Sequence, residues 1–136
     1  MDTTPMVSHP ARLLITDDDR DFRETLGELL ARRGFETILA EDGQEAVEIV
    51  QKNPVHLLMI DMHMPRLTGI ETLATLRNLS LIIPSILMSA KLDESIVVQA
   101  RELDAAQVIA KPFSGKAIVS TICDILRSRY GWELHL

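Results

Sequence analysis

The chain has 136 residues, which suits one domain with a hydrophobic core of its own. Its formal net charge of −6 argues against direct binding of nucleic acid by this domain. No apolar run approaches the roughly 18 residues of a membrane-spanning helix, and a single cysteine excludes an internal disulfide framework. The composition therefore predicts a domain that lies in a reducing compartment, such as the cytoplasm, and does not enter a membrane.

Short apolar runs alternate with helical apolar spacing five times along the chain. The runs predict strands at residues 12–16, 35–40, 56–61, 85–88 and 107–110. The helical spacing predicts a first helix from Asp19 to Gly34 and a second from Asp42 to just before Pro54. A third helix should begin at Thr68, which forms a capping box with Glu71. Two further helices are predicted over residues 92–103 and from Ser114 to about Tyr130.

Five repeats of strand and helix with short connections predict an α/β fold. We expect a doubly wound, five-stranded parallel sheet with right-handed crossovers and helices on both faces. The domain should cover residues 11–130. Residues 1–10 are expected to form a flexible tail, and residues 131–136 a second tail or the start of a linker.

Polar side chains end four of the predicted strands, which are otherwise almost wholly apolar. Asp17 and Asp18 follow the first strand, Asp61 ends the third, Ser89 follows the fourth, and Lys111 follows the fifth. The carboxyl ends of parallel strands meet at one edge of a sheet, where ligands collect in such folds. The sequence therefore predicts three carboxylates, a hydroxyl and an ammonium at one edge.

Three neighbouring carboxylates repel one another unless a cation joins them. Oxygen ligands without a histidine or thiol cluster favour Mg²⁺, which leaves room for phosphate oxygens. With Lys111 as a second positive centre and Ser89 as a hydroxyl donor, the set predicts a pocket for a phosphoryl group. Asp61 would be its nucleophile, because carboxylates can form aspartyl phosphates.

The motifs that carry this chemistry are Asp17-Asp18, Asp61 with Met64-Pro65, Ser89-Ala90 and Lys111-Pro112-Phe113. In order and spacing they resemble the receiver domain of two-component response regulators, and the likeness covers about residues 11–130. The resemblance implies a flavodoxin-like fold of five strand–helix units with sheet order 2-1-3-4-5. It also implies a cis peptide bond before the proline of the last motif.

The resemblance further implies a Mg²⁺ site. Asp18 would be a direct ligand and Asp17 a water-mediated one, while Asp61 and the backbone carbonyl of His63 would complete the protein ligands. Asp61 would also be the phosphoacceptor.

Two further roles follow from the same likeness. Ser89 would be the switch hydroxyl that moves toward the phosphoryl group, and Lys111 would pair with the phosphoryl oxygens. The expected protein is thus a phosphorylation-dependent signalling domain rather than an enzyme, with only self-catalysed phosphorylation and slow autodephosphorylation.

The implied partners are a sensor histidine kinase or a histidine phosphotransfer protein, together with an output protein or domain. The output surface expected in this family is formed by the helix over 92–103, the strand at 107–110 and the last helix. A homodimer on phosphorylation is a further possibility that the resemblance raises.

Three positions add detail or depart from the family pattern. Val108 stands where receivers often carry an aromatic residue that rotates inward on switching. His63 and Lys91 lie two residues after the phosphoacceptor and the switch serine. Their side chains either border the path of an attacking water or are simply exposed on their loops.

Two other classes of protein share parts of the pattern. A phosphatase with an aspartyl intermediate usually carries a second acidic residue two positions after the nucleophile, where this chain has His63. A flavin- or nucleotide-binding module needs a phosphate loop after the first strand, where this chain has Asp17, Asp18 and Asp19. Both alternatives fit the sequence less well than a receiver.

Overall fold

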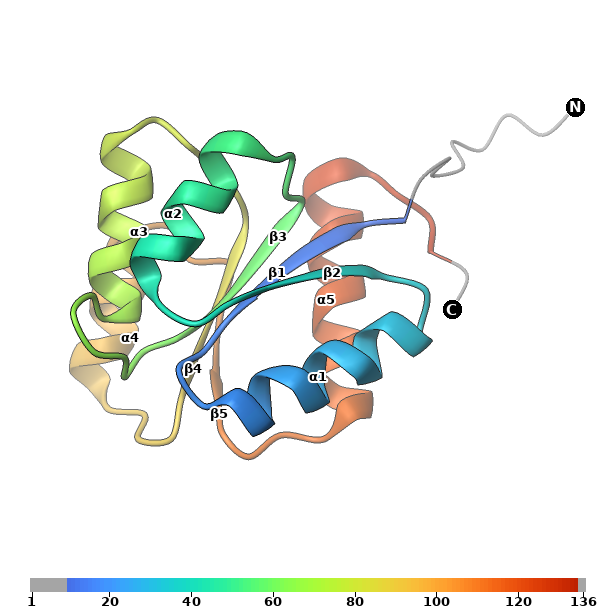
Figure 1. Cartoon of the computed structure of the whole chain (residues 1–136), viewed down its shortest axis with the longest axis horizontal. Coiled ribbons are helices and arrows are strands. Elements are labelled where there is room, and N and C mark those ends of the chain that lie inside the picture. Colours follow the sequence, from blue (N-terminus) through green and yellow to red (C-terminus); the bar gives the residue numbers. More distant parts are fainter. Residues whose placement is uncertain (1–9, 135–136) are drawn as a thin grey trace, which may run out of the picture.

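The computed structural model describes residues 10–134, in which strands and helices alternate along the chain (Figure 1). The strands are β1 (Arg12–Thr16), β2 (Glu36–Ala40), β3 (Leu57–Asp61), β4 (Ser85–Ser89) and β5 (Gln107–Ala110). The helices are α1 (Arg20–Arg32), α2 (Gly43–Lys52), α3 (Gly69–Asn78), α4 (Glu94–Glu102) and α5 (Gly115–Tyr130).

The strands form one parallel sheet in the order β2-β1-β3-β4-β5. This order confirms the predicted flavodoxin-like topology. β3 lies at the centre, and all five of its residues are buried, as expected for a strand covered on both faces. The register pairs Asp61 with Met88, so β3 and β4 end almost level at the same edge.

The two faces of the sheet are covered by different helices (Figure 1). Because side chains alternate along a strand, Leu57 and Met59 pack on the face covered by α1 and α5. Leu58 and Ile60 pack on the opposite face, under α2, α3 and α4. This arrangement confirms the doubly wound fold.

Each helix begins at a polar residue whose side chain accepts a hydrogen bond from the backbone three residues on. These caps are Asp19, Asp42, Thr68, Asp93 and Ser114. The capping box predicted for Thr68 and Glu71 is present. Caps at these points place each helix immediately after the loop that leaves the carboxyl edge of the sheet.

Several predicted boundaries were wrong by one or two residues. β2 begins at Glu36 because the Phe35 amide still bonds to the carbonyl of Leu30 in the turn that closes α1. β3 begins at Leu57 rather than at residue 56. α4 is shorter than residues 92–103 because Asp93 is its N-cap and lies outside the helix.

The segment after α5 lies against the amino edge of the sheet as far as residue 134. Gly131 turns the chain with a φ of 67°, and the indole of Trp132 then stacks on Tyr130 with 4.5 Å between ring centroids. The Tyr130 hydroxyl donates to the carbonyl of His56 at 2.7 Å. Trp132 and Leu134 also pack against the core beneath α1 and α5. Residues 1–9 of the predicted N-terminal tail and residues 135–136 lie outside the described residues.

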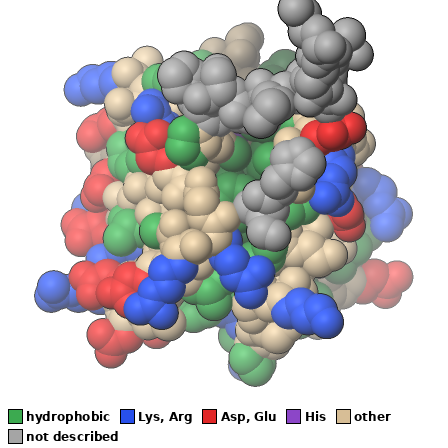
Figure 2. All heavy atoms as spheres, turned by 90° about the vertical axis from the view of Figure 1, so that its right-hand side faces the viewer, with side chains coloured by type: hydrophobic (Ala, Val, Ile, Leu, Met, Phe, Trp, Pro, Cys, Tyr) green, Lys and Arg blue, Asp and Glu red, His purple; other side chains and the backbone are tan. Residues whose placement is uncertain are grey.

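The surface mixes charges of both signs, as Figure 2 shows for the face on the right-hand side of Figure 1. Within residues 10–134, no helix has both the length and the apolar character that crossing a membrane requires.

Candidate functional site

The structure brings the predicted polar residues together at the carboxyl edge of the sheet. Asp17 and Asp18 follow β1, and Asp61 and Ser89 are the last residues of β3 and β4. Lys111 follows β5, and its amide donates to the carbonyl of Ser89 at 2.8 Å. Its peptide bond to Pro112 is cis, as the resemblance implied.

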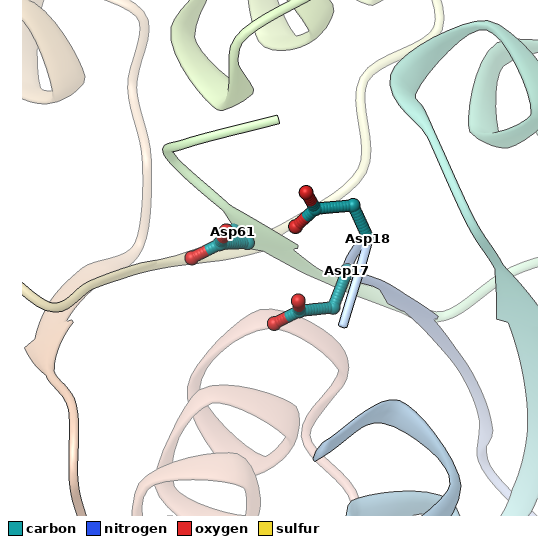
Figure 3. Close-up of side chains that lie close together, drawn as sticks. All are labelled: Asp17, Asp18 and Asp61. Carbon is teal, nitrogen blue, oxygen red and sulfur yellow. The ribbon is translucent and has the colours of Figure 1, made fainter. Parts of the chain in front are cut away.

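The three carboxylates form one cluster, in which an oxygen from each of Asp17, Asp18 and Asp61 lies within 4.8 Å of the others (Figure 3). Asp17 is fully buried and Asp61 is 5% exposed, whereas Asp18 is open to solvent. The cluster therefore has a rigid inner side formed by two strands and one outer carboxylate that a ligand can reach.

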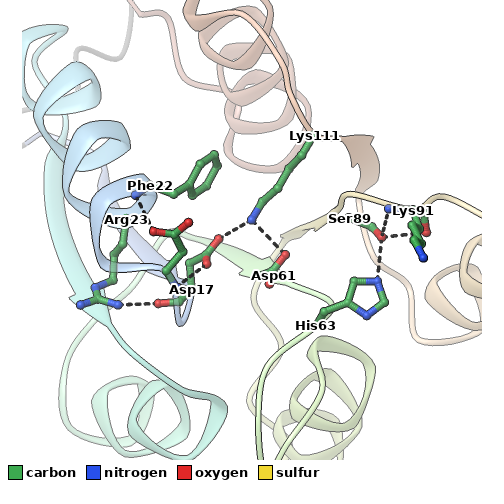
Figure 4. A network of polar contacts seen from close by, with 9 residues as sticks. Asp17, Phe22, Arg23, Asp61, His63, Ser89, Lys91 and Lys111 are labelled. Carbon is green, nitrogen blue, oxygen red and sulfur yellow. Dashed lines mark hydrogen bonds and ion pairs between the residues drawn. The ribbon is translucent and has the colours of Figure 1, made fainter.

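The Lys111 ammonium neutralises part of this charge. Its Nζ lies 2.6 Å from Oδ2 of Asp17 and 3.1 Å from Oδ1 of Asp61 (Figure 4). It also lies 4.0 Å from the centre of the Phe22 ring, a cation–π distance. Two carboxylates and an aromatic face thus hold the ammonium beside the oxygens of Asp61.

The loop after β1 is fixed by hydrogen bonds on both sides of Asp17. Its Oδ1 accepts from the amide of Asp19 at 2.9 Å, and its carbonyl accepts from Nη1 of Arg23 at 2.6 Å. The Asp17 amide donates to the carbonyl of Ala40 at 3.1 Å. These bonds leave little freedom for the carboxylate, which therefore stays directed at Lys111.

Burial and crowding shift the protonation equilibria at this edge. Burial raises the pKa of Asp61, and the neighbouring charge of Asp17 raises it further, while Lys111 opposes both effects. For Lys111, burial alone would lower the pKa, but its ion pairs with Asp17 and Asp61 outweigh burial and raise it. The surroundings of Asp61 thus compensate the negative charge of its carboxylate only in part.

The residues present fit a divalent cation. Three carboxylates and one ammonium leave a formal charge of −2 on the cluster. The clustered side-chain ligands are oxygens alone, which Mg²⁺ prefers, and the exposure of Asp18 leaves room for waters. Asp17, Asp18 and Asp61 are therefore the side chains that could hold the ion.

Ser89 lies on the other side of Asp61 from Asp17 and is fully buried. Its hydroxyl donates to the carbonyl of Lys91 at 2.8 Å and accepts from the Lys91 amide at 3.1 Å. Nε2 of His63 lies 3.2 Å from the same oxygen (Figure 4). The hydroxyl is thus held by the loop that follows β4 and by the side chain of His63.

With this geometry in place, the comparisons with known proteins decide the family. The sequence model of the response regulator receiver domain matches residues 13–123. The chain belongs to the response regulator receiver family. Receivers are phosphoacceptor modules of two-component signalling, and they bind Mg²⁺ at an acidic cluster such as the one in this chain. The predicted family and general function are confirmed.

Relatives and solved structures agree with this assignment. The receiver is 37% identical over 118 residues to response regulator RR06 of Streptococcus pneumoniae, covering 87% of this chain and 54% of the relative. It is 37% identical over 122 residues to the transcriptional regulatory protein CpxR of Escherichia coli, covering 90% of this chain and 51% of the relative. The chain thus spans about half the length of these curated relatives.

Among solved structures, the receiver domain of the Francisella response regulator 1452 superposes with a TM-score of 0.80 at 28% identity. The superposition covers 88% of this chain and 98% of that one. The two structures therefore share most of the receiver fold.

Sequence reasoning missed four contacts of this receiver. It placed Lys111 beside the phosphoryl site but did not foresee its shorter bond to Asp17, or its position over Phe22. Nor did it foresee the bond from Arg23 to the Asp17 carbonyl or the contact of His63 with Ser89. Phe22 and Arg23 lie in the first turn of α1, and this turn directly follows Asp17, Asp18 and Asp19. Their position next to these aspartates was the sequence signal that could have indicated the contacts.

Proposed function

We propose that Asp61 is the phosphoacceptor of this receiver, with Lys111 and Ser89 as the side chains that pair with the phosphoryl oxygens. The observation that carries this proposal is the position of Asp61. It ends the central strand, lies 3.1 Å from the Lys111 ammonium, and shares a cluster with the carboxylates of Asp17 and Asp18. A nucleophile, a counter-charge and a set of metal ligands therefore converge on one point.

The transfer step follows from this arrangement. A carboxylate oxygen of Asp61 attacks the phosphorus atom of a phosphohistidine, and a P–O bond forms as the P–N bond breaks. The electron pair of the broken bond stays on the histidine nitrogen of the donor. Lys111 is already within ion-pair distance of Asp61, so its positive charge can stabilise the negative charge on the oxygens of the transferred phosphoryl group.

Mg²⁺ belongs to the same proposal. The ion would be held by Asp18 directly, by Asp17 through a water, by Asp61 and by the carbonyl of His63. It would supply positive charge beside the phosphoryl oxygens and lower the repulsion among the carboxylates. The formal charge of −2 on the cluster supports this assignment.

The proposed partners are a sensor histidine kinase or a histidine phosphotransfer protein, which would meet this receiver in the cytoplasm. The output would be a partner protein or a following domain that contacts the face formed by α4, β5 and α5. On α4, Val98 is 44% exposed, and Leu92 just before the helix is 42% exposed, so apolar contact area is available there. A homodimer on phosphorylation could use the same face.

The proposal is tested by incubating the chain with acetyl phosphate and Mg²⁺ and measuring its mass. We expect an added phosphoryl group that hydroxylamine removes, as it does from acyl phosphates. Asp61→Asn should abolish the adduct. Asp124→Asn is a matched control, because this carboxylate lies on α5 with its side chain 75% exposed. An adduct that survives in Asp61→Asn, or its absence from the parent chain, would refute the assignment.

The phosphatase alternative is disfavoured by the same geometry. Its second acidic residue would stand at position 63, but the side chain there is an imidazole that contacts Ser89. We therefore expect the phosphoryl group to turn over slowly, by autodephosphorylation alone, so that the domain acts as a switch. Rapid multiple turnover of a small phosphodonor would favour the phosphatase instead.

A further inference from the structure

The hydroxyl of Ser89 has no hydrogen-bonding capacity left in this structure. A serine hydroxyl has one hydrogen to donate and two lone pairs that accept. Ser89 donates to the Lys91 carbonyl at 2.8 Å and accepts from the Lys91 amide at 3.1 Å. One lone pair remains, and Nε2 of His63 lies 3.2 Å from the oxygen.

The direction of the His63 contact follows from this count. Because the single hydrogen of Ser89 is directed at the Lys91 carbonyl, the serine cannot also donate to the imidazole. Nε2 of His63 must therefore carry a hydrogen and donate it to Oγ of Ser89. The three bonds together saturate a side chain that is fully buried, whereas His63 is exposed and can leave its partner for water.

We propose that His63 is a positioning residue whose Nε2–H holds Ser89 in the resting orientation of the switch. The inference rests on the proposed function, because it assigns a role relative to the phosphoryl group on Asp61. To donate to a phosphoryl oxygen, Ser89 must withdraw its hydrogen from the Lys91 carbonyl and give up the bond from His63. His63 thereby opposes switching.

The Lys91 bonds and the His63 bond differ in how they respond to substitution. Both Lys91 bonds use backbone atoms, so they persist whatever side chain stands at position 91. The His63 bond uses a side chain and can be removed without changing the backbone carbonyl at that position. The structure thus allows the contribution of His63 to be measured separately.

The first experiment measures the affinity of the chain for beryllofluoride, a stable phosphoryl mimic, in the presence of Mg²⁺. Loss of one hydrogen bond that stabilises the resting orientation should raise the fraction of molecules in which Ser89 is free to bind the phosphoryl mimic. Apparent binding of beryllofluoride should therefore tighten about fivefold. We expect this change in His63→Phe and His63→Asn, which cannot present a donor where Nε2 lies. In His63→Gln, whose amide nitrogen reaches that position, affinity should stay close to that of the parent.

A double-mutant cycle separates positioning from direct contact with the ligand. In a Ser89→Ala background, His63→Phe should no longer change beryllofluoride affinity, because the partner of the bond is absent. If the fivefold change persists there, or if His63→Phe weakens binding, His63 acts on the ligand itself and the proposal is wrong. If His63→Phe leaves affinity unchanged in the parent background, the proposal is also wrong.

A second readout uses the metal-free chain and no ligand. The proton couplings across the Cα–Cβ bond of Ser89 report its rotamer, which should be single in the parent and in His63→Gln. In His63→Phe and His63→Asn the couplings should shift toward rotamer averaging. Unchanged couplings would overturn the role of His63 even where beryllofluoride binds. Absence of beryllofluoride binding by the parent, with a single Ser89 rotamer, would instead count against the proposed function.

Discussion

The Lys111 ammonium lies between two carboxylates from different strands, 2.6 Å from Oδ2 of Asp17 and 3.1 Å from Oδ1 of Asp61. One cation thus links a proposed metal ligand to the proposed phosphoacceptor. In the absence of metal, Lys111 supplies the positive charge that the cluster requires, and a bound Mg²⁺ would share the same oxygens.

Replacement of Lys111 by methionine should destabilise the metal-free chain by about 1–3 kcal/mol, because two buried carboxylates lose a charged partner. Mg²⁺ should recover more stability in Lys111→Met than in the parent, because the ion replaces the missing charge. Urea unfolding with and without Mg²⁺ measures both effects. Lys116→Met is the control, because Lys116 is an exposed lysine on α5. An equal loss in both variants would show that the ion pairs contribute little.

Replacement of Asp61 by asparagine should stabilise the metal-free chain by roughly 1 kcal/mol near neutral pH. Burial and then Asp17 raise the pKa of Asp61, so the folded state binds a proton more tightly than the unfolded chain. The stability of the parent therefore falls as pH rises through the folded pKa, and Asn removes this loss.

The gain in Asp61→Asn should disappear at acidic pH, where the carboxyl group is neutral in both states. With Mg²⁺ present the order should reverse, because the parent has one more carboxylate to bind the ion. Urea unfolding across pH checks the sign. A variant less stable than its parent near neutral pH without metal would contradict the prediction.

Replacement of Gly69 by alanine should destabilise the chain by about 1–3 kcal/mol and displace the loop after Asp61. A Cβ there would lie 2.7 Å from the backbone oxygen of Asp61 and 2.6 Å from Cδ1 of Leu87. Gly115→Ala is a matched control, because it also occupies the first position of a helix. A Cβ at Gly115 would lie 2.7 Å from Cδ1 of Leu29, which is the end of a side chain that can rotate away. Thermal unfolding of both variants should therefore show the larger loss for Gly69→Ala.

Acidification should loosen the contact between the end of α5 and the amino edge of the sheet. Burial, and then the charge of Arg12, lower the pKa of His56, whose Nδ1 accepts from the Arg12 amide at 2.8 Å. The unfolded chain therefore binds a proton more readily than the folded one. Stability from this neutral imidazole is complete above about pH 6.5 and is lost as pH falls through the folded pKa.

His56→Asn tests this pH dependence, because an amide oxygen can accept the Arg12 hydrogen bond and does not titrate. We expect a smaller fall in stability between about pH 6.5 and pH 5 than in the parent. Trp132 is the only tryptophan, and its ring centroid lies 4.9 Å from that of His56. Its fluorescence should therefore follow the same pH change in the parent. An identical pH profile in His56→Asn would exclude His56 as the cause.

Much of the fold follows from the sequence because its determinants are local. Strands buried on both faces appear in the sequence as apolar runs, and polar caps such as Asp42 and Thr68 mark the points where helices begin. The shared edge of Asp17, Asp61 and Lys111 also follows, since the topology of a parallel sheet brings its carboxyl ends together.

Tertiary structure alone decided which polar atoms meet. Lys111 bonds to Asp17 across 94 positions, and His63 contacts Ser89 across 26, so no local pattern signals either pair. These contacts depend on rotamers that neighbouring strands and loops impose, whereas sequence spacing specifies only the backbone element that carries each side chain. The sequence by itself determined that an aspartate stands at the end of the central strand. Tertiary packing decided that Lys111 and Asp17 shift the pKa of that aspartate, because their side chains meet it only after the strands pair.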